Sequence, residues 1–238
     1  FKMTTVPYKG TPIFNEDGTF RKEDDKVQGR SYSSNLTKLL KQLPKLQNLQ
    51  EGKKASPVMA HISLTNACNL TCSFCCFANR DISEKMPTEK VFQALESFKA
   101  IGVTGVEFTG GGEPSIHPHF KEIVQYAKDL GFSLGICTNG ARFGANRPIK
   151  KDIVELFDWV RLGMYGFYEG YDYDLSVFEG TNCKPSAAYV WDENLETSKN
   201  PNITGDWSDV KNKRVLSKKF QTTENFIRML DWVEENQI

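Results

Sequence analysis

From residue 58 onward, short apolar runs alternate with longer segments in which apolar residues recur every three or four positions. The short runs predict buried strands over residues 58–65, 105–109, 132–138, 159–165 and 186–191. The longer segments predict helices over residues 88–101, 118–130, 149–158 and 223–236. Gly102 and Gly131 end the first two helices. Residues 192–222 are polar and are expected to form a loop.

Single helices between successive strands predict an α/β fold with a parallel sheet, whether open or closed into a barrel. In such folds the functional loops follow the carboxyl ends of the strands. A crowded group of cysteines follows the first predicted strand, Gly110-Gly111-Gly112-Glu113-Pro114 follows the second, and Asn139-Gly140 follows the third. We therefore expect one site at this edge of the sheet.

Residues 1–57 differ from the rest and are predicted to be an N-terminal extension of a domain covering residues 58–238. A helix is expected over residues 35–43, interrupted by Pro44. The segment holds 11 Lys and Arg against 6 Asp and Glu, so it carries about five positive charges. It is either a solvated extension or an arm that binds a partner.

Composition excludes several classes of protein. The 238 residues are 39% hydrophobic and 25% charged, which is typical of globular domains. With 30 basic and 30 acidic residues, no overall field attracts nucleic acid. No apolar run is long enough to cross a membrane and no secretory signal is evident, so a cytoplasmic location is expected.

The cysteines carry the candidate chemistry. Cys68, Cys72, Cys75 and Cys76 lie within nine residues, which favours a metal or redox centre over disulfides. The first three can converge on a soft metal centre, whereas the fourth adjoins its neighbour and is an awkward ligand. Zinc normally takes four ligands. A cubane iron–sulfur cluster can instead take three thiolates and leave one iron open.

Cx3Cx2C, with Phe74 before the last cysteine, followed by Gly111-Gly112-Glu113-Pro114 after the next strand, resembles the radical S-adenosylmethionine (SAM) superfamily. The resemblance covers residues 58–165 well and residues 166–238 loosely. It implies a partial (β/α)6 TIM-like barrel. Only about five strands are legible and the chain ends on a helix, which indicates either a truncated barrel or closure by other residues.

The resemblance also implies roles for individual residues. Cys68, Cys72 and Cys75 would hold a [4Fe-4S] cluster whose open iron binds SAM. The residues that would contact SAM are Phe74 at the adenine, Gly111, Gly112 and Glu113 at the methionyl ammonium, and Asn139 and Arg161 at its carboxylate or ribose. Gly163 and Tyr165 stand where the family often has Ser and Asp, so the ribose contacts depart from the pattern. Reduction by a flavodoxin or ferredoxin would then yield a 5′-deoxyadenosyl radical that abstracts a hydrogen atom from the substrate.

Other residues are weaker candidates. Cys76, Tyr165 and Cys183 are possible catalytic residues, with simple packing as the alternative for each. Cys137 is expected in the core, and His61 in the core or the sheet. His117 and His119 are expected to form a turn rather than a ligand pair. Aromatic residues could wall a substrate cavity or pack within a loop; they are Tyr165, Phe167, Tyr168, Tyr171 and Tyr173.

The substrate is left open by these motifs. A peptide or natural product is favoured, because the sequence shows no basic stripe for nucleic acid. A nucleotide or nucleic acid, and a glycyl-radical enzyme to be activated, are further alternatives. A non-catalytic zinc or iron–sulfur binding module is the alternative from another class.

Overall fold

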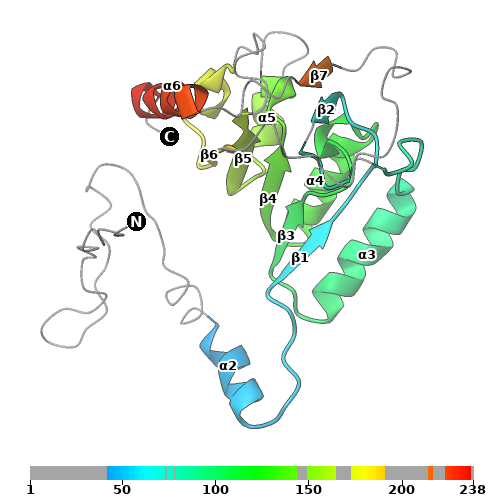
Figure 1. The fold of residues 1–238 in the computed structure, drawn as a ribbon. Helices are drawn as coiled ribbons and strands as arrows, with labels where there is room; N and C mark the ends of the chain where they lie inside the picture. Colours follow the sequence, from blue (N-terminus) through cyan, green and yellow to red (C-terminus); the bar gives the residue numbers. More distant parts are fainter. Residues whose placement is uncertain are drawn as a thin grey trace, which may run out of the picture. The chain divides into compact units, whose positions relative to one another are not determined.

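The computed structural model describes residues 42–72, 74–77, 79–143, 149–164, 173–190, 214–216 and 223–236. Its main feature is an open, five-stranded parallel sheet in the order β1-β3-β4-β5-β6 (Figure 1). The strands are β1 (Met59–Ile62), β3 (Gly105–Phe108), β4 (Ser133–Thr138), β5 (Trp159–Gly163) and β6 (Lys184–Ala188). The chain divides into two compact units, Phe1–Leu46 and Gln47–Ile238, and the sheet lies in the second.

Helices connect the strands and bury one face of the sheet. They are α3 (Thr88–Ala100), α4 (Phe120–Asp129) and the short α5 (Lys151–Val154). Val91 and Leu95 of α3, and Ile123 and Val124 of α4, are fully buried in the same core as the strand residues. The strand residues of this core include Val106, Phe108, Leu134, Ile136, Val160 and Leu162. Because strand side chains alternate between faces, the residues between these positions point to the opposite face.

The structure confirms the α/β class, the parallel sheet and the order of strands and helices predicted from the sequence. The boundaries differ where local turns compete with regular structure. The helix expected over 118–130 begins at Phe120, and a separate 3₁₀ turn, Pro114–Ile116 (η1), precedes it. The helix expected over 149–158 is shorter, because α5 ends at Val154; beyond it, the Asp158 carboxylate accepts the Leu134 N–H beside the start of β5.

Two expectations are wrong. Pro44 does not interrupt a helix; it lies in the first turn of α2 (Leu43–Gln50), where its missing N–H needs no partner. Residues 192–222 are not all loop, because β7 (Arg214–Leu216) pairs in parallel with β2 (Leu70–Cys72) inside the cysteine segment. Most of residues 35–43 and of residues 192–222 lie outside the described residues. The C-terminal helix is confirmed as α6 (Thr223–Glu235).

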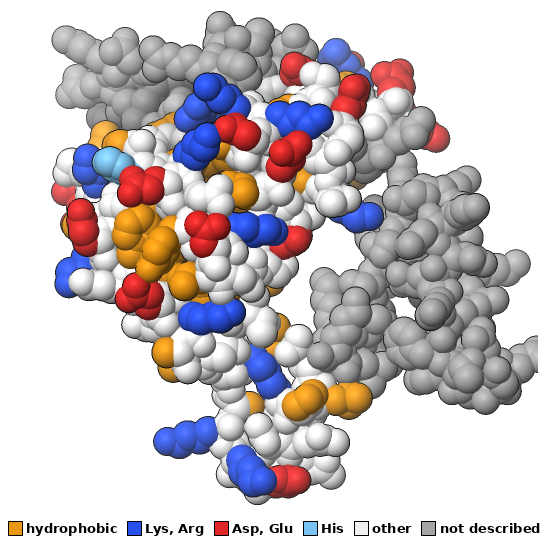
Figure 2. All heavy atoms as spheres, turned by 180° about the vertical axis from the view of Figure 1, so that it is seen from behind, with side chains coloured by type: hydrophobic (Ala, Val, Ile, Leu, Met, Phe, Trp, Pro, Cys, Tyr) orange, Lys and Arg blue, Asp and Glu red, His pale blue; other side chains and the backbone are white. Residues whose placement is uncertain are grey.

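The charge pattern also agrees with the composition. On the face seen in Figure 2, Lys and Arg side chains of the described residues are interspersed with Asp and Glu rather than gathered into a stripe. Within the described ranges, no helix has both the length and the apolar character needed to cross a membrane.

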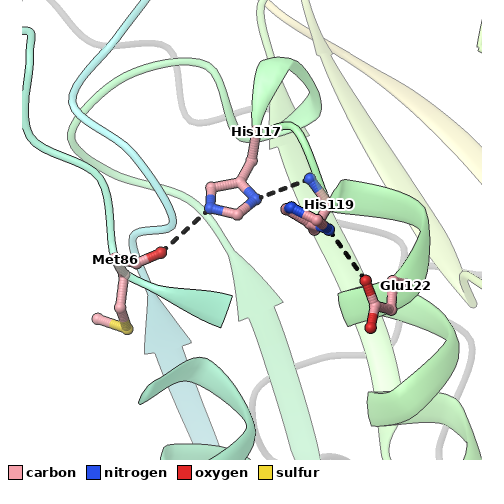
Figure 3. Close-up of polar contacts among 4 residues, drawn as sticks. All are labelled: Met86, His117, His119 and Glu122. Atoms are coloured by element: carbon pink, nitrogen blue, oxygen red, sulfur yellow. Dashed lines mark hydrogen bonds and ion pairs between the residues drawn. The ribbon is translucent and has the colours of Figure 1, made fainter. Parts of the chain in front are cut away.

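The two histidines before α4 form a turn, as predicted (Figure 3). Nε2 of His117 lies 3.1 Å from the Met86 carbonyl oxygen, and Nδ1 accepts the His119 backbone N–H at 3.2 Å. A carbonyl can only accept, so the proton of the neutral ring lies on Nε2. His119 Nδ1 lies 3.0 Å from the Glu122 carboxylate. The buried His117 therefore joins the entry of α4 to the segment before α3.

This geometry predicts a pH dependence of stability. Burial is the main cause that lowers the pKa of His117, and protonation of Nδ1 would break its bond to His119. As the pH is lowered, the unfolded chain therefore binds this proton at a higher pH than the folded protein does. The free energy of unfolding falls as the pH drops below about 6.5. In thermal unfolding of the apo-protein, the loss of Tm between pH 7 and pH 5.5 should be about 2 °C smaller in His117→Gln than in the native protein. The exposed His119→Gln is the matched control, and equal losses in all three proteins would contradict this assignment.

Candidate functional site

The cysteine segment follows β1 and is anchored by one buried side chain. Leu70, 2% exposed, contacts Cys68, Cys72 and Phe74. A turn follows β2, in which the Cys75 N–H donates to the Cys72 carbonyl at 3.1 Å. The segment is therefore folded around Leu70, with the cysteines at successive turns.

The three motif thiols are partly buried and close enough to affect one another. Burial is the largest cause that raises the pKa of Cys72, and the neighbouring Cys68 and Cys75 raise it further. Burial also raises the pKa of Cys68, more strongly than any other influence. Cys76 is exposed. Cys72 is thus the motif cysteine that lies near both of the others.

Two nitrogen donors approach the sulfurs. Nη1 of Arg80 donates to Cys75 Sγ at 3.4 Å, and Nδ2 of Asn139 lies 3.7 Å from Cys68 Sγ. The Asn139 amide is fixed, because it also donates to Asn69 Oδ1 at 2.7 Å and accepts the Ala141 N–H. The end of β4 therefore touches the cysteine segment directly.

The glycine loop after β3 lies against the residues that precede Cys68. The Gly112 N–H donates to the Thr65 carbonyl at 2.7 Å, and the Glu113 N–H donates to the Ala67 carbonyl at 2.9 Å. A Cβ on Gly112 would lie 1.7 Å from the Ala67 oxygen. No other residue fits there, because the two backbones are in contact. This contact fixes the glycine loop beside the cysteines.

Glu113 connects the ends of two strands. Its side chain is buried, and Oε1 accepts from the Ser115 backbone N–H, the Ser115 hydroxyl and the Thr138 hydroxyl at 3.1, 2.6 and 2.8 Å. Oε2 accepts the Asn139 N–H at 2.8 Å. Oε1 is thus crowded by three donors, whereas Oε2 accepts only one of the described hydrogen bonds and can accept a further donor.

The donor set fits an iron–sulfur cluster. Cys72 lies close enough to Cys68 and Cys75 for both to raise its pKa, and N–H donors face the sulfurs of Cys68 and Cys75. N–H donors of this kind stabilise cluster thiolates. In the described part of the chain, no three His, Cys, Asp or Glu side chains meet as ligands of one metal ion. A cubane does not require that arrangement, because each thiolate binds a different iron.

The remaining predicted residues are distributed unevenly. Phe74 contacts the Leu70 cluster, and Arg161 is exposed on β5. Tyr165, Phe167, Tyr168 and Tyr171 lie outside the described residues, whereas Tyr173 is buried and donates to the Gly163 carbonyl at 3.2 Å.

Cys183 is a core residue rather than a residue of an exposed polar loop. It is 5% exposed, belongs to the apolar core, and precedes β6 at the amino edge of the sheet, opposite the cysteine segment. Burial raises the pKa of this thiol to about 12. The sequence around Cys183 is polar, which suggested an exposed loop. In the tertiary structure the residue is nevertheless buried.

Sequence reasoning missed a polar row on the sheet face opposite α3 and α4. Cys137 is not a core residue: its thiol donates to Glu107 Oε1 at 2.9 Å. Nδ1 of His61, whose side chain is 60% exposed, lies 3.6 Å from Glu107 Oε2. Burial, and then the bond to Glu107, raises the pKa of Cys137 to about 12. Arg161 is the register partner of Cys137 on the next strand.

The Trp159 indole lies on the same face of the sheet as this row. A Cβ on Gly135 would lie 2.2 Å from the Trp159 indole, so the ring crosses β4 at the glycine. Gly135 lies two residues before Cys137, on the same face. The sequence does contain a signal for this row. Polar or small residues recur every second position in strands that are otherwise apolar, which predicts a strand with one polar face.

Comparison with known proteins gives the family. Residues 62–169 match the model of the Radical SAM superfamily. This segment, a little under half of the chain, is therefore similar to the radical SAM superfamily. The match contains all three motif cysteines and the glycine loop.

Individual relatives cover parts of the chain. An S-adenosylmethionine-dependent nucleotide dehydratase of Selenomonas ruminantium is 35% identical over 98 residues, which are 41% of this chain and 35% of that protein. The sporulation killing factor maturation protein SkfB of Bacillus subtilis is 34% identical over 85 residues, 35% of this chain and 20% of that protein. This chain therefore spans well under two thirds of these relatives.

A solved structure supports the fold. Streptococcus suis SuiB, in a crystal structure bound to the precursor peptide SuiA, is 19% identical with a TM-score of 0.52. The likeness covers 87% of this chain and 44% of SuiB. It shows that the sheet and helices have the arrangement of a radical SAM partial barrel.

The contact between the two loops predicts a specific sensitivity. Gly112→Ala should lower the free energy of unfolding by about 1–3 kcal/mol, because the new methyl group would overlap the Ala67 carbonyl. Gly105→Ala is the matched control, since its nearest new neighbour would lie at an ordinary 3.5 Å. Urea unfolding of the apo-protein measures both. A Gly112→Ala midpoint equal to that of Gly105→Ala would contradict the loop contact.

Proposed function

We propose that this protein is a radical SAM enzyme in which Cys68, Cys72 and Cys75 hold a [4Fe-4S] cluster. The observation that carries the proposal is the convergence of these three thiols beside the glycine loop, at the carboxyl edge of the sheet. When bound, the reduced cluster supplies the electron that cleaves SAM to methionine and a 5′-deoxyadenosyl radical. A flavodoxin or ferredoxin is the electron donor that we expect.

The chain's own residues would bind and orient SAM. The free position on Glu113 Oε2 and the backbone of Gly111 and Gly112 suit the methionyl ammonium, which carries several N–H donors. Phe74 would lie against the adenine, and Asn139 and Arg161 near the carboxylate or the ribose.

The open face of the sheet is the surface that we assign to the substrate. Glu107 is 8% exposed and accepts one thiol hydrogen bond, so it retains acceptor positions for N–H groups. Arg161 forms no ion pair or hydrogen bond with the described residues and can meet an anionic group. A peptide carries both N–H groups and carboxylates. A peptide substrate also agrees with the presence of the maturation protein SkfB among the relatives. A nucleotide is the second candidate, because the 35% identical relative is named a nucleotide dehydratase.

Anaerobic reconstitution tests the proposed enzyme. The native protein should take up about four irons per chain and release 5′-deoxyadenosine when dithionite and SAM are added. Cys68→Ala, Cys72→Ala and Cys75→Ala should each hold less than about half of this iron, whereas Cys76→Ala, the neighbouring control, should hold all of it. Bound zinc without a nucleoside product would contradict the proposal. Stimulation of 5′-deoxyadenosine release by peptides or by nucleotides separates the two substrate classes.

The proposed role of Glu113 has its own test. Glu113→Gln removes the charge that would meet the ammonium, so the affinity for SAM should fall about tenfold while the iron content stays native. Equilibrium dialysis with labelled SAM, alongside iron analysis, measures both quantities. The exposed Glu122→Gln is the matched control. Parallel loss of iron and SAM would show that Glu113 acts on the fold through Ser115 and Thr138 instead.

A further inference from the structure

Arg80 lies five residues after the last motif cysteine and belongs to neither recognised motif. Its guanidinium makes three hydrogen bonds within the cysteine segment. Nε donates to the Asn66 carbonyl at 2.6 Å, and Nη1 donates to the Phe77 carbonyl at 2.6 Å and to Cys75 Sγ at 3.4 Å. The side chain is half-buried.

These acceptors lie on both sides of the three cysteines. Asn66 precedes Cys68 by two residues, and Phe77 follows Cys75 by two residues. The Asn66 end is itself fixed, because its N–H donates to the Glu84 carbonyl at 2.9 Å and its amide donates to Glu84 Oε2 at 3.1 Å. One planar guanidinium thus bridges the entry and the exit of the cysteine segment. A lysine has a single nitrogen and cannot hold this geometry.

The charge of Arg80 lies directly against one motif thiol, because Nη1 donates to Cys75 Sγ at 3.4 Å. The same guanidinium is held in place by the Asn66 and Phe77 carbonyls. A fixed cation therefore faces one of the three sulfurs that would hold the cluster. One-electron reduction of a bound cluster adds one negative charge, which a fixed neighbouring cation and an N–H···S bond both stabilise.

We propose that Arg80 is a positioning residue with two effects: it holds the cysteine segment in its folded form before a cluster binds, and it raises the reduction potential of the bound cluster. The second effect rests on the proposed function. The first concerns the apo-protein alone. Arg80→Gln removes both the bridge and the charge, whereas Arg80→Lys keeps the charge and loses the bridge.

Amide hydrogen exchange of the apo-protein tests the bridge. In Arg80→Gln and Arg80→Lys, peptides covering 68–77 should exchange at least about tenfold faster than in the native protein. Peptides from β3 and β4 should be unchanged, and Lys90→Gln, a charge removal on the exposed surface of α3, should leave the cysteine segment unchanged. Native exchange rates over 68–77 in Arg80→Gln would overturn the bridge, whether or not that variant takes up a cluster.

Redox titration of the reconstituted proteins, followed by electron paramagnetic resonance, tests the charge. At a fixed potential the ratio of reduced to oxidised cluster should be about tenfold lower in Arg80→Gln, which corresponds to about 59 mV for a one-electron couple. Arg80→Lys should lie closer to the native value. A native potential in Arg80→Gln would overturn this effect, because a merely structural residue would not move it.

The remaining outcomes are also decisive. If neither variant takes up iron, faster exchange over 68–77 supports the bridge and native exchange contradicts it. If the native protein itself takes up no iron, the proposed function fails, while the exchange experiment still decides the role of Arg80 in the apo-protein.

Discussion

The site depends on one contact between two backbones. Gly112 and Glu113 donate their N–H groups to the carbonyls of Thr65 and Ala67, which lie just before the first motif cysteine. Gly112 has no side chain, and this allows the loops after β1 and β3 to meet. Glu113 then extends the connection to β4 through Thr138 and Asn139. Three loops on three neighbouring strands are thereby fixed as one unit.

This unit holds polar groups that would be costly to bury separately. The buried carboxylate of Glu113 is stabilised by four hydrogen bonds, and the thiols of Cys68 and Cys75 face Asn139 and Arg80. Burial keeps the free thiols protonated, because it raises the pKa of Cys68 and Cys72. A metal cluster needs thiolates, so its binding must release these protons, and the preformed loop lowers the entropy cost of that step.

The sheet separates two environments. The face under α3 and α4 is apolar, whereas the other face carries Glu107, Cys137 and Arg161 above the Trp159 indole. Glu107 has a thiol partner and a partly exposed histidine beside it, and a closed hydrophobic core would not tolerate a carboxylate so placed. The polar row therefore distinguishes the face of the sheet opposite α3 and α4 from the apolar core.

The sequence by itself determined the α/β class, the order of the elements and the gathering of three motifs at one edge, because hydrophobic periodicity and βα connectivity are local properties. The spacing of Cys68, Cys72 and Cys75 also marked them in the sequence as candidate ligands of a metal centre. Tertiary structure decided the rest. The contacts of Arg80 and Asn139 with the sulfurs, the burial of Cys183 and the exposure of the row at Cys137 all depend on which segments meet in space. Separation along the sequence does not show which residues are in contact in the folded protein. Asn139 and Cys68, for example, are 71 residues apart, yet their side chains are in contact.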